Sequence, residues 1–359
     1  MNTLRLTIDA KHLETPEARD ALDCAAAILR AGGLVALPTE TVYGLGANAL
    51  DRAAVERIFA AKSRPAWDPI IVHVASLEML DGLVEQLPDA ARRLMEHFWP
   101  GPLTLLVPRT AAVPDCVTAG RPLVGVRVPS HPVALELIRR AGVPVAAPSA
   151  NRFGHTSPTT AQHVLDDLEG RIDAVLDAGP SARGVESTVL DPAPTPMVIY
   201  RPGAVTAEQI RALAGPVEIF KSAESPRETP AQALPSPGAG IRHYAPRARL
   251  VLLDVADVDA SKEDALLAGI GARLDAALQN EPGKKAGVML PDGVAAPAAI
   301  APHRVFRWGR WNAPEELAQR LYAGLRALDA AGCAVILCPL PPPGGIGAAL
   351  RDRLRKAAR

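Results

Sequence analysis

Four short polar segments within the first 215 residues carry the side chains best suited to hold small charged substrates. In each of them a strand-like apolar run gives way to a turn, which is where ligand sites of open α/β sheets are found. Their hydroxyl, amide and cationic groups can orient polar substrates, and we expect one shared site. The segments are PTETVYGLG (38–46), KSRPAWDP (62–69), PSANRFGHTSPT (148–159) and the pair VESTVLD and YRPG (185–191 and 200–203).

Lys62 and Arg64 lie two residues apart and are followed by Pro65, which keeps the chain extended. A lysine point charge beside an arginine fork suits several phosphate oxygens. The alternative is a solvated helix end, where lysine also interacts favourably with the helix dipole. The pair alone does not decide between these interpretations.

The segment 148–159 predicts an anion cradle. It supplies Ser149, Asn151, His155, Thr156 and Ser157, and it ends where a helix is expected to start with outward-pointing N–H groups. Ser157 can also act simply as the cap of that helix. Both roles are compatible.

His73 lies in the apolar run IIVHV, where a buried structural histidine is the default interpretation. Strand alternation places its side chain on the opposite sheet face from Val72 and Val74, which can direct it towards the same cavity. The motifs GxxxxGK[ST], GxSxG and HExxH are absent from the sequence, which argues against P-loop nucleotide binding and the commonest hydrolase and zinc protease chemistries.

Composition limits the class of protein further. The 359 residues include 39 basic and 39 acidic side chains, so no global field attracts nucleic acid or an anionic membrane, and any anion site must be local. The four cysteines are scattered without CxxC spacing and are expected to be reduced core residues. No signal peptide is recognisable, and no uncharged run reaches the ~18 residues that a spanning helix needs, so we expect a cytoplasmic protein without membrane contact.

The order of the predicted elements favours an α/β fold. Apolar spacing and capping residues predict helices and strands in alternation, but several strands follow one another with no room for a helix, which indicates a twisted mixed sheet over 1–217. The predicted elements are a helix at 16–30, a strand at 34–37, a helix from Asp51, strands at 70–74, 103–109 and 124–129, a helix at 132–140, a strand at 144–151, a helix opened by Ser157 and Pro158, three further strands, and a helix with a Thr206–Gln209 capping box that Gly215 closes.

A proline-rich, apolar-poor stretch separates this domain from the rest, and we predict an extended linker at 218–248. Its end contains Arg242, His243 and Tyr244, which are poor spacer residues. After it, 249–359 predicts a second, smaller α/β domain. We expect this domain to serve as a scaffold that anchors the linker.

Taken together, the segments resemble the Sua5/YrdC family of L-threonylcarbamoyladenylate synthases over nearly all of residues 20–215. The linker end SPGAGIRHYAP and the C-terminal stretch LRALDAAGCAVILCPLPPPGGIGAALRDRLRKAA are similar to the longer, two-domain Sua5 form. The segments that carry the resemblance are, in order, PTETVYGLG, KSRP with IIVH, FWPGPLT, VRVPSHP, PSANRFGHTSPT, ESTVLD and YRPG.

The resemblance implies a nucleotidyltransferase that joins L-threonine, bicarbonate and ATP into threonylcarbamoyl-AMP and releases pyrophosphate. It also implies a YrdC-like twisted sheet around a positively charged cavity and a Sua5-type C-terminal domain with a Rossmann-like α/β fold. The product feeds the N6 modification of adenosine 37 in tRNA. The implied partners are therefore the three substrates and a downstream tRNA threonylcarbamoyl transferase, with weak or no direct binding of tRNA.

The resemblance also assigns roles to residues. Thr41, His73, Arg127 and Ser187 would hold L-threonine, with Arg127 facing its carboxylate. Lys62 and Arg64 would be the catalytic cations. ATP would be bound by Lys62, Arg64, Ser149, Asn151, Ser157, Arg201 and Tyr244.

Two further expectations concern the surroundings of ATP. Tyr244 would close as part of a lid over the site. Mg²⁺ is expected with the triphosphate, held mostly by phosphate oxygens and not by a protein carboxylate cage.

The sequence departs from the family pattern at a few positions. Asp68 stands where asparagine is more frequent, and a carboxylate near phosphates repels them unless Mg²⁺ or a basic neighbour compensates. Phe153 replaces a small residue, Leu123 replaces a threonine, and 239–241 replace bulkier linker residues.

The sequence also allows two alternative functions, an RNA-binding module and a carbamoyl-adenylating transferase. An RNA-binding module without chemistry is disfavoured by the neutral net charge and by the lack of aromatic residues interleaved with basic runs. A carbamoyl-adenylating transferase is disfavoured because the acylphosphatase and zinc-finger segments of those enzymes are missing.

Overall fold

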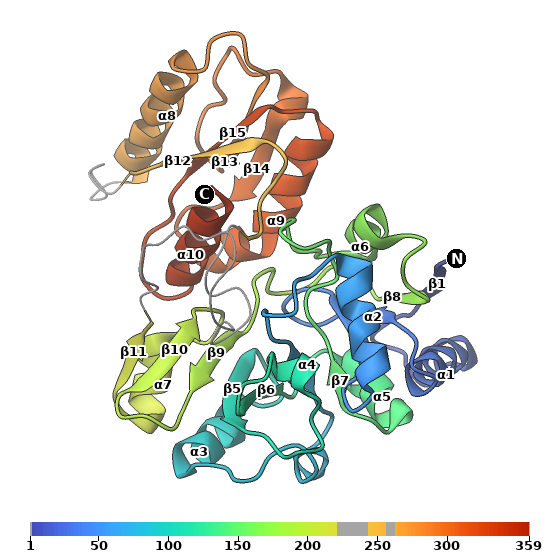
Figure 1. The fold of residues 1–359 in the computed structure, drawn as a ribbon. Helices are drawn as coiled ribbons and strands as arrows, with labels where there is room; N and C mark the ends of the chain where they lie inside the picture. The colour runs from blue at the N-terminus through green and yellow to red at the C-terminus, as the bar shows by residue number, and fades with distance from the viewer. Residues whose placement is uncertain (1, 221–242, 256–262, 359) are drawn as a thin grey trace. The chain divides into compact units, whose positions relative to one another are not determined.

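The computed structural model describes residues 2–220, 243–255 and 263–358. Its contacts divide the chain into two compact units (Figure 1). The first comprises Met1–Phe153 and Ser157–Ile241, and the second comprises Arg242–Arg359 together with Gly154–Thr156. Most of the predicted linker, 221–242, lies outside the described residues, so its extended form and the proposed linker boundaries stay predictions.

The first unit contains a sheet of eleven strands in the order β1-β8-β2-β3-β7-β4-β6-β5-β9-β10-β11. Parallel and antiparallel neighbours both occur in it: β4 runs parallel to β6 but antiparallel to β7, for example. The mixed sheet is confirmed. The strands are β1 (Leu4–Thr7), β2 (Val35–Leu37), β3 (Gly44–Asn48), β4 (Ile71–His73), β5 (Leu103–Pro108), β6 (Leu123–Arg127), β7 (Val145–Ala146), β8 (Ala174–Asp177), β9 (Thr188–Asp191), β10 (Met197–Arg201) and β11 (Val217–Ile219).

The helices of this unit begin and end mostly where caps predict. Thr206 and Gln209 form the expected capping box, and Gly215 follows the helix end with a positive φ of 103°. The helices are α1 (Pro16–Arg30), α2 (Arg52–Lys62), α3 (Asp89–Phe98), α4 (Asp115–Thr118), α5 (Pro132–Ala141), α6 (Ala161–Leu168) and α7 (Ala207–Ala214), with a short 3₁₀ turn at Glu78–Leu80.

Two predicted boundaries were wrong. The helix expected to open at Ser157 and Pro158 begins at Ala161, with Thr160 as its cap. The hydroxyl of Ser157 instead donates to Glu186. The strand expected at 144–151 is β7 alone, because beyond it only an isolated bridge between Ser149 and Gly44 of β3 continues the pairing into the polar turn at 148–159.

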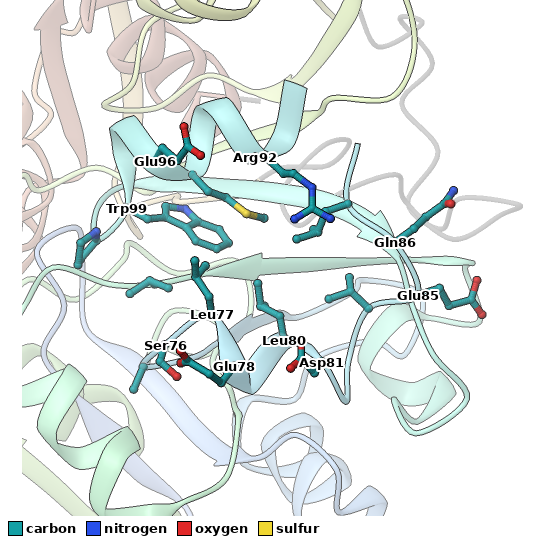
Figure 2. Close-up of a pocket in the computed structure, with 16 residues that line it drawn as sticks. Ser76, Leu77, Glu78, Leu80, Asp81, Glu85, Gln86, Arg92, Glu96 and Trp99 are labelled. Atoms are coloured by element: carbon teal, nitrogen blue, oxygen red, sulfur yellow. The ribbon is translucent and has the colours of Figure 1, made fainter. Parts of the chain in front are cut away.

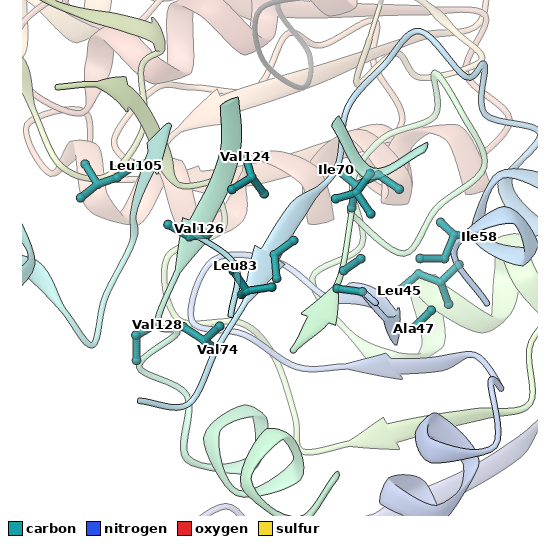
Figure 3. Close-up of a cluster of buried hydrophobic side chains, with 14 of the residues drawn as sticks. Leu45, Ala47, Ile58, Ile70, Val74, Leu83, Leu105, Val124, Val126 and Val128 are labelled. Carbon is teal, nitrogen blue, oxygen red and sulfur yellow. The ribbon is translucent and has the colours of Figure 1, made fainter. Parts of the chain in front are cut away.

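Apolar side chains form a core on each face of the sheet. Alternation along β2 sends Ala36 into one core and Val35 with Leu37 into the other. The core of Figure 3 gathers side chains such as Leu45, Val126 and Ile58. The opposite core lies under the packed pair α1 and α5. The sheet is thus covered on both faces.

The second unit is a smaller parallel α/β domain, as predicted. Its four strands pair in parallel in the order β12-β15-β13-β14. Trp308 is buried and its indole N–H donates to the carbonyl of Leu317 at 2.7 Å. The elements are β12 (Arg249–Leu253), α8 (Glu263–Gln279), β13 (Ala286–Pro291), a 3₁₀ turn (Pro302–Arg304), β14 (Val305–Gly309), α9 (Pro314–Ala330), β15 (Val335–Pro339) and α10 (Gly347–Ala357).

The expectations for the cysteines and for membrane-spanning helices can be compared with the structure. All four cysteines are unpaired thiols; Cys333 and Cys338 are buried, whereas Cys24 and Cys116 are half-buried, so the core prediction holds for two of them. Within the described ranges, no helix is both long and apolar enough to cross a bilayer.

We predict that Leu45→Ala lowers the free energy of unfolding by about 2–5 kcal/mol, because it leaves a cavity in the hydrophobic core where the fully buried Leu45 side chain packs. Leu50→Ala is the matched control, since Leu50 is 44% exposed and its truncation should change stability by about 0.5 kcal/mol or less. Urea denaturation followed by circular dichroism measures both. Equal effects of the two substitutions would contradict the assigned core.

Candidate active site

The polar segment 38–43 is the turn between β2 and the antiparallel strand β3. Its hydroxyls are engaged locally: Thr39 Oγ1 lies 2.8 Å from Thr41 Oγ1 and donates to the carbonyl of Val42 at 2.6 Å. These bonds fix the turn and hold Thr41 in place. The hydroxyls that follow β2 therefore shape a rigid corner at the end of the strand.

Arg127, the last residue of β6, joins this corner. Its Nη1 donates to Thr41 Oγ1 at 3.1 Å, its Nε donates to the carbonyl of Gly101 at 3.0 Å, and its Nη2 lies 2.6 Å from Glu40 Oε1. Each terminal nitrogen carries a second N–H, which is the pair that a carboxylate needs. The predicted residues Thr41 and Arg127 are thus in direct contact.

Glu40 keeps its charge beside Arg127. Burial favours the neutral acid, but the charge and hydrogen bond of Arg127 outweigh it, and the pKa of Glu40 falls below its ordinary value. The result is a buried ion pair, in which the carboxylate offsets the cost of burying the guanidinium.

His73 lies on β4 as the register partner of Arg127 on β6. It is buried, and burial together with the charge of Arg127 lowers its pKa to about 3. The imidazole is therefore neutral around pH 7. A neutral ring can accept or donate a hydrogen bond there without adding positive charge.

Lys62 ends α2, and Ser63 after it turns the chain in the left-handed region at φ 53°. The ammonium of Lys62 donates to the carbonyls of Ser149 (2.6 Å) and Asn151. The backbone N–H of Phe153 in turn donates to the Lys62 carbonyl at 2.9 Å. Burial and then the charge of Arg64 lower the pKa of Lys62 well below its ordinary value.

Arg64 holds a tight turn that follows Lys62. Its Nη2 lies 2.9 Å from Asp68 Oδ2 and donates to the carbonyl of Pro69 at 2.7 Å. Asp68, the departure from the family pattern, is thus compensated by a basic neighbour. A triphosphate that reached Arg64 would have to compete with this buried carboxylate.

Ser187 and Arg201 form a third contact of the predicted set. Arg201 Nη2 donates to Ser187 Oγ and its Nε to the Ser187 carbonyl, both at 3.1 Å. Ser187 Oγ also lies 2.8 Å from Thr104 Oγ1 on β5. Next along the chain, Glu186 accepts a hydrogen bond from Ser157 at 2.6 Å. Ser157 is thereby tied to the Ser187–Arg201 pair.

Backbone bonds connect these groups into one region. The N–H of Leu45 donates to Pro148 O (2.7 Å) and that of Tyr43 to Pro158 O (2.9 Å). The N–H of Ala150 donates back to Tyr43 O at 2.8 Å. The corner at 38–45 is therefore clasped by both ends of the segment 148–159. The structure joins the threonine-side residues to Ser149, Asn151 and Ser157.

Tyr244, which the resemblance assigns to ATP, falls in the second unit. Its ring is buried there, stacked on Tyr322 with centroids 5.9 Å apart, and the guanidinium of Arg353 lies 5.1 Å from it. Contact of Tyr244 with ATP stays a prediction.

The sequence motifs did not predict roles for three residues that contact the predicted site residues: Glu40, Glu186 and Thr104. All three lie inside segments that had been singled out, namely PTETVYGLG, ESTVLD and FWPGPLT. The signal that could have found Glu40 is charge balance, because a buried cation requires acceptors. Glu186 and Thr104 meet the hydroxyls of Ser157 and Ser187, and sequence did not show these pairings.

A separate cavity of about 630 Å³ lies elsewhere in the first unit (Figure 2). Its lining comes from 75–87 and 92–100 together with Val128, and none of the predicted site residues contributes to it. Four carboxylates line it against a single arginine, Arg92, which makes it unsuited to a triphosphate. The lining carboxylates are those of Glu78, Asp81, Glu85 and Glu96.

Comparison with known proteins agrees with this architecture. Residues 27–203 match the Sua5/YciO/YrdC family model, described as telomere recombination, and residues 205–359 match the model described as the C-terminal domain of threonylcarbamoyl-AMP synthase. Among curated relatives, threonylcarbamoyl-AMP synthases of Pyrococcus abyssi and Bacillus subtilis are each 42% identical. The alignments cover 93% of this chain and 93% and 92% of those proteins.

A solved structure supports the same conclusion for both units. The crystal structure of P. abyssi Sua5 complexed with L-threonine matches with a TM-score of 0.84 at 40% identity, over 100% of this chain and 98% of that one. A YrdC-like mixed-sheet unit followed by a parallel α/β unit defines the two-domain form of the fold. The chain belongs to the Sua5/YrdC family, and within it to the threonylcarbamoyl-AMP synthases. Neither the RNA-binding module nor the carbamoyl-adenylating enzyme is supported.

We predict that the imidazole of His73 stays neutral between about pH 8 and 5, because its pKa lies at about 3. Since this folded-state pKa is below the unfolded value, the stability that His73 contributes is complete above about pH 6.5 and is lost as the pH falls towards 3. NMR of ¹³C-labelled histidine measures the titration. His12 is the control: its hydrogen bond to Asp9 raises its pKa, so its signal should titrate. Titration of His73 near pH 6.5 would contradict its burial.

Proposed function

We propose that the network around Arg127 and Lys62 binds L-threonine and ATP side by side for the synthesis of threonylcarbamoyl-AMP. The observation that carries the proposal is the buried guanidinium of Arg127, which is oriented by Thr41, Glu40 and Gly101 at the end of β6. A fixed, desolvated guanidinium is the group that selects a carboxylate in a defined orientation. The likeness to Sua5 complexed with L-threonine supports threonine as the ligand.

The reaction needs positioning more than a protein nucleophile. The threonine amine attacks the carbon of CO₂ and loses a proton, or attacks that of bicarbonate with loss of water, and either route gives a carbamate. A carbamate oxygen then attacks the α-phosphorus of ATP, the bond to the bridging oxygen breaks, and pyrophosphate leaves. Threonine, bicarbonate and ATP thus give threonylcarbamoyl-AMP, pyrophosphate and water. Orientation and charge neutralisation supply most of the catalysis in such a displacement.

On the threonine side, Arg127 binds the carboxylate. His73, neutral at the working pH, lies next to Arg127 across the β4–β6 pair and offers a ring nitrogen without repelling the amine. Thr41 and Ser187 provide hydroxyls for the polar groups of the amino acid. Glu40 holds Arg127 and balances its charge in the free site.

On the nucleotide side, the buried cations Lys62, Arg64 and Arg201 neutralise the triphosphate. Lys62 already organises the backbone of Ser149 and Asn151. When phosphate oxygens approach Lys62, they favour its charged form and oppose the pKa depression that burial imposes. Ser157 supplies a hydroxyl to ATP, and Tyr244 supplies a further contact.

Mg²⁺ accompanies ATP in this proposal. In the described parts of the chain no group of three metal-binding side chains comes together, so the residues do not form a cage of their own. Phosphate oxygens then supply most of the ligands, and no step of the reaction is assigned to the ion.

The product is a mixed anhydride, which water hydrolyses readily. We propose that this product passes to a tRNA threonylcarbamoyl transferase. The synthase itself binds tRNA weakly or not at all. It works in the cytoplasm, where ATP and tRNA are present. The balanced charge of 39 basic and 39 acidic residues supports weak tRNA binding.

Pyrophosphate release tests the reaction. We expect release only when ATP, threonine and bicarbonate are all present, and a loss of about 100-fold or more in Arg64→Ala, because a buried cation is removed from the phosphate site. Arg52→Ala, on the exposed start of α2, the helix that precedes Arg64, should retain full activity. Release without threonine or bicarbonate would contradict the proposed reaction.

Arg127→Lys tests the threonine site. Lysine keeps the charge but loses the fork that faces a carboxylate, so the KM for threonine should rise about tenfold or more while the KM for ATP changes little. Arg139→Lys, on the exposed face of α5, serves as the control. An equal rise in both KM values would argue against a carboxylate contact.

A further inference from the structure

Three residues in the middle of the segment 148–159 belong to the second unit and not to the first: Gly154, His155 and Thr156. The N–H of Ala245 donates to the carbonyl of Gly154 at 2.9 Å, and His155 pairs with Ala245 in an isolated parallel bridge. The hydroxyl of Thr156 donates to the carbonyl of Tyr244 at 3.4 Å. The loop is therefore held along its backbone by the start of the second unit.

Arg326 completes this attachment. It lies on α9, and its Nη2 donates to the carbonyl of Thr156. Thr156 is buried, so its carbonyl depends on protein partners for its hydrogen bonds. A bond from a charged donor is stronger than one between neutral groups. Arg326 thus fixes Thr156, the last residue of Gly154–Thr156, and it does so from α9, which packs on β13 and β14.

The backbone that pairs with the loop is itself rigid. Tyr244 adopts a left-handed conformation, with φ at 63°, which a non-glycine residue keeps only where its surroundings impose it. Stacking on Tyr322 of α9 and the cation–π contact with Arg353 of α10 provide that constraint. The helices α9 and α10 of the second unit therefore hold the peptide to which Gly154–Thr156 are bound.

The loop is flanked on both sides by residues assigned to ATP. Asn151 lies three residues before Gly154, with its carbonyl bound by Lys62, and Ser157 directly follows Thr156, with its hydroxyl bound to Glu186. Because the chain is continuous, the position of the Thr156 carbonyl sets where Ser157 begins. We propose that Arg326 is a positioning residue for ATP binding, which acts through the Thr156 carbonyl to hold the Asn151–Ser157 loop.

This inference rests on the proposed function, since it takes Asn151 and Ser157 to be ATP ligands. It gives the second unit a part in nucleotide binding beyond anchoring the linker. It also separates the two substrates. Thr41 and Arg127 bond to each other, to Thr39, Glu40 and Gly101, and not to Gly154–Thr156. ATP binding should therefore respond to the loss of Arg326 far more than threonine binding does.

The test is isothermal titration calorimetry of the full chain with ATP and Mg²⁺ and, separately, with L-threonine. In Arg326→Ala the Kd for ATP should rise about tenfold or more, the scale expected for the loss of a charged hydrogen bond to a buried carbonyl, while the Kd for threonine stays within about twofold. Arg326→Lys, which keeps the charge and a donor, should recover part of the ATP affinity.

Arg320→Ala is the matched control, because Arg320 lies on the same helix and donates to a backbone carbonyl within the second unit, that of Arg307 at 2.6 Å. It should bind both ligands as the unchanged protein does. Unchanged ATP affinity in Arg326→Ala would overturn the inference, and so would an equal loss for ATP and threonine, which indicates general destabilisation. If the unchanged protein bound threonine but not ATP, the proposed function itself would be rejected, and this inference with it.

Discussion

The burial of positive charge is the constraint on which the site depends. Lys62, Arg64, Arg127 and Arg201 are each at most 7% exposed. A buried cation is tolerated only when acceptors surround it, because the loss of hydration costs several kcal/mol per ion in real proteins. The turns that follow β2, α2 and β7 supply acceptors for Arg127, Arg64 and Lys62, as backbone carbonyls, a hydroxyl or carboxylates. Gly101 before β5 and Ser187 before β9 supply the others, for Arg127 and Arg201.

This constraint explains the irregular backbone of the site. A regular strand at 148–151 would use its carbonyls within the sheet, whereas here those of Ser149 and Asn151 turn to Lys62. The same holds for Arg64, whose turn presents the carbonyls of Asp68 and Pro69. Because these dipoles are fixed before substrate arrives, little reorganisation is needed when charge develops during the reaction.

Much of this could be predicted from sequence. Apolar periodicity and caps gave the alternation of helices and strands, since both are local properties of the chain. Strand β3 was not predicted, because GLGAN holds two glycines and no β-branched residue. Its Gly46 is required by packing, since a Cβ at this position would lie only 2.8 Å from the side chain of Leu37. The start of α6 was misplaced because Ser157 bonds to Glu186, 29 residues away. Motifs identified the right segments, but Thr41 lies 86 residues from its partner Arg127 and Thr104 lies 83 residues from its partner Ser187, and no local pattern encodes such pairs.

A crystal structure of the protein with L-threonine and α,β-methylene-ATP tests the central claim most directly. The account predicts the threonine carboxylate within hydrogen-bonding distance of both terminal nitrogens of Arg127, at about 2.7–3.2 Å, with the triphosphate against Lys62 and Ser157. Ligands found instead in the cavity at 75–100, with the contacts of Arg127 and Lys62 unchanged, would contradict it.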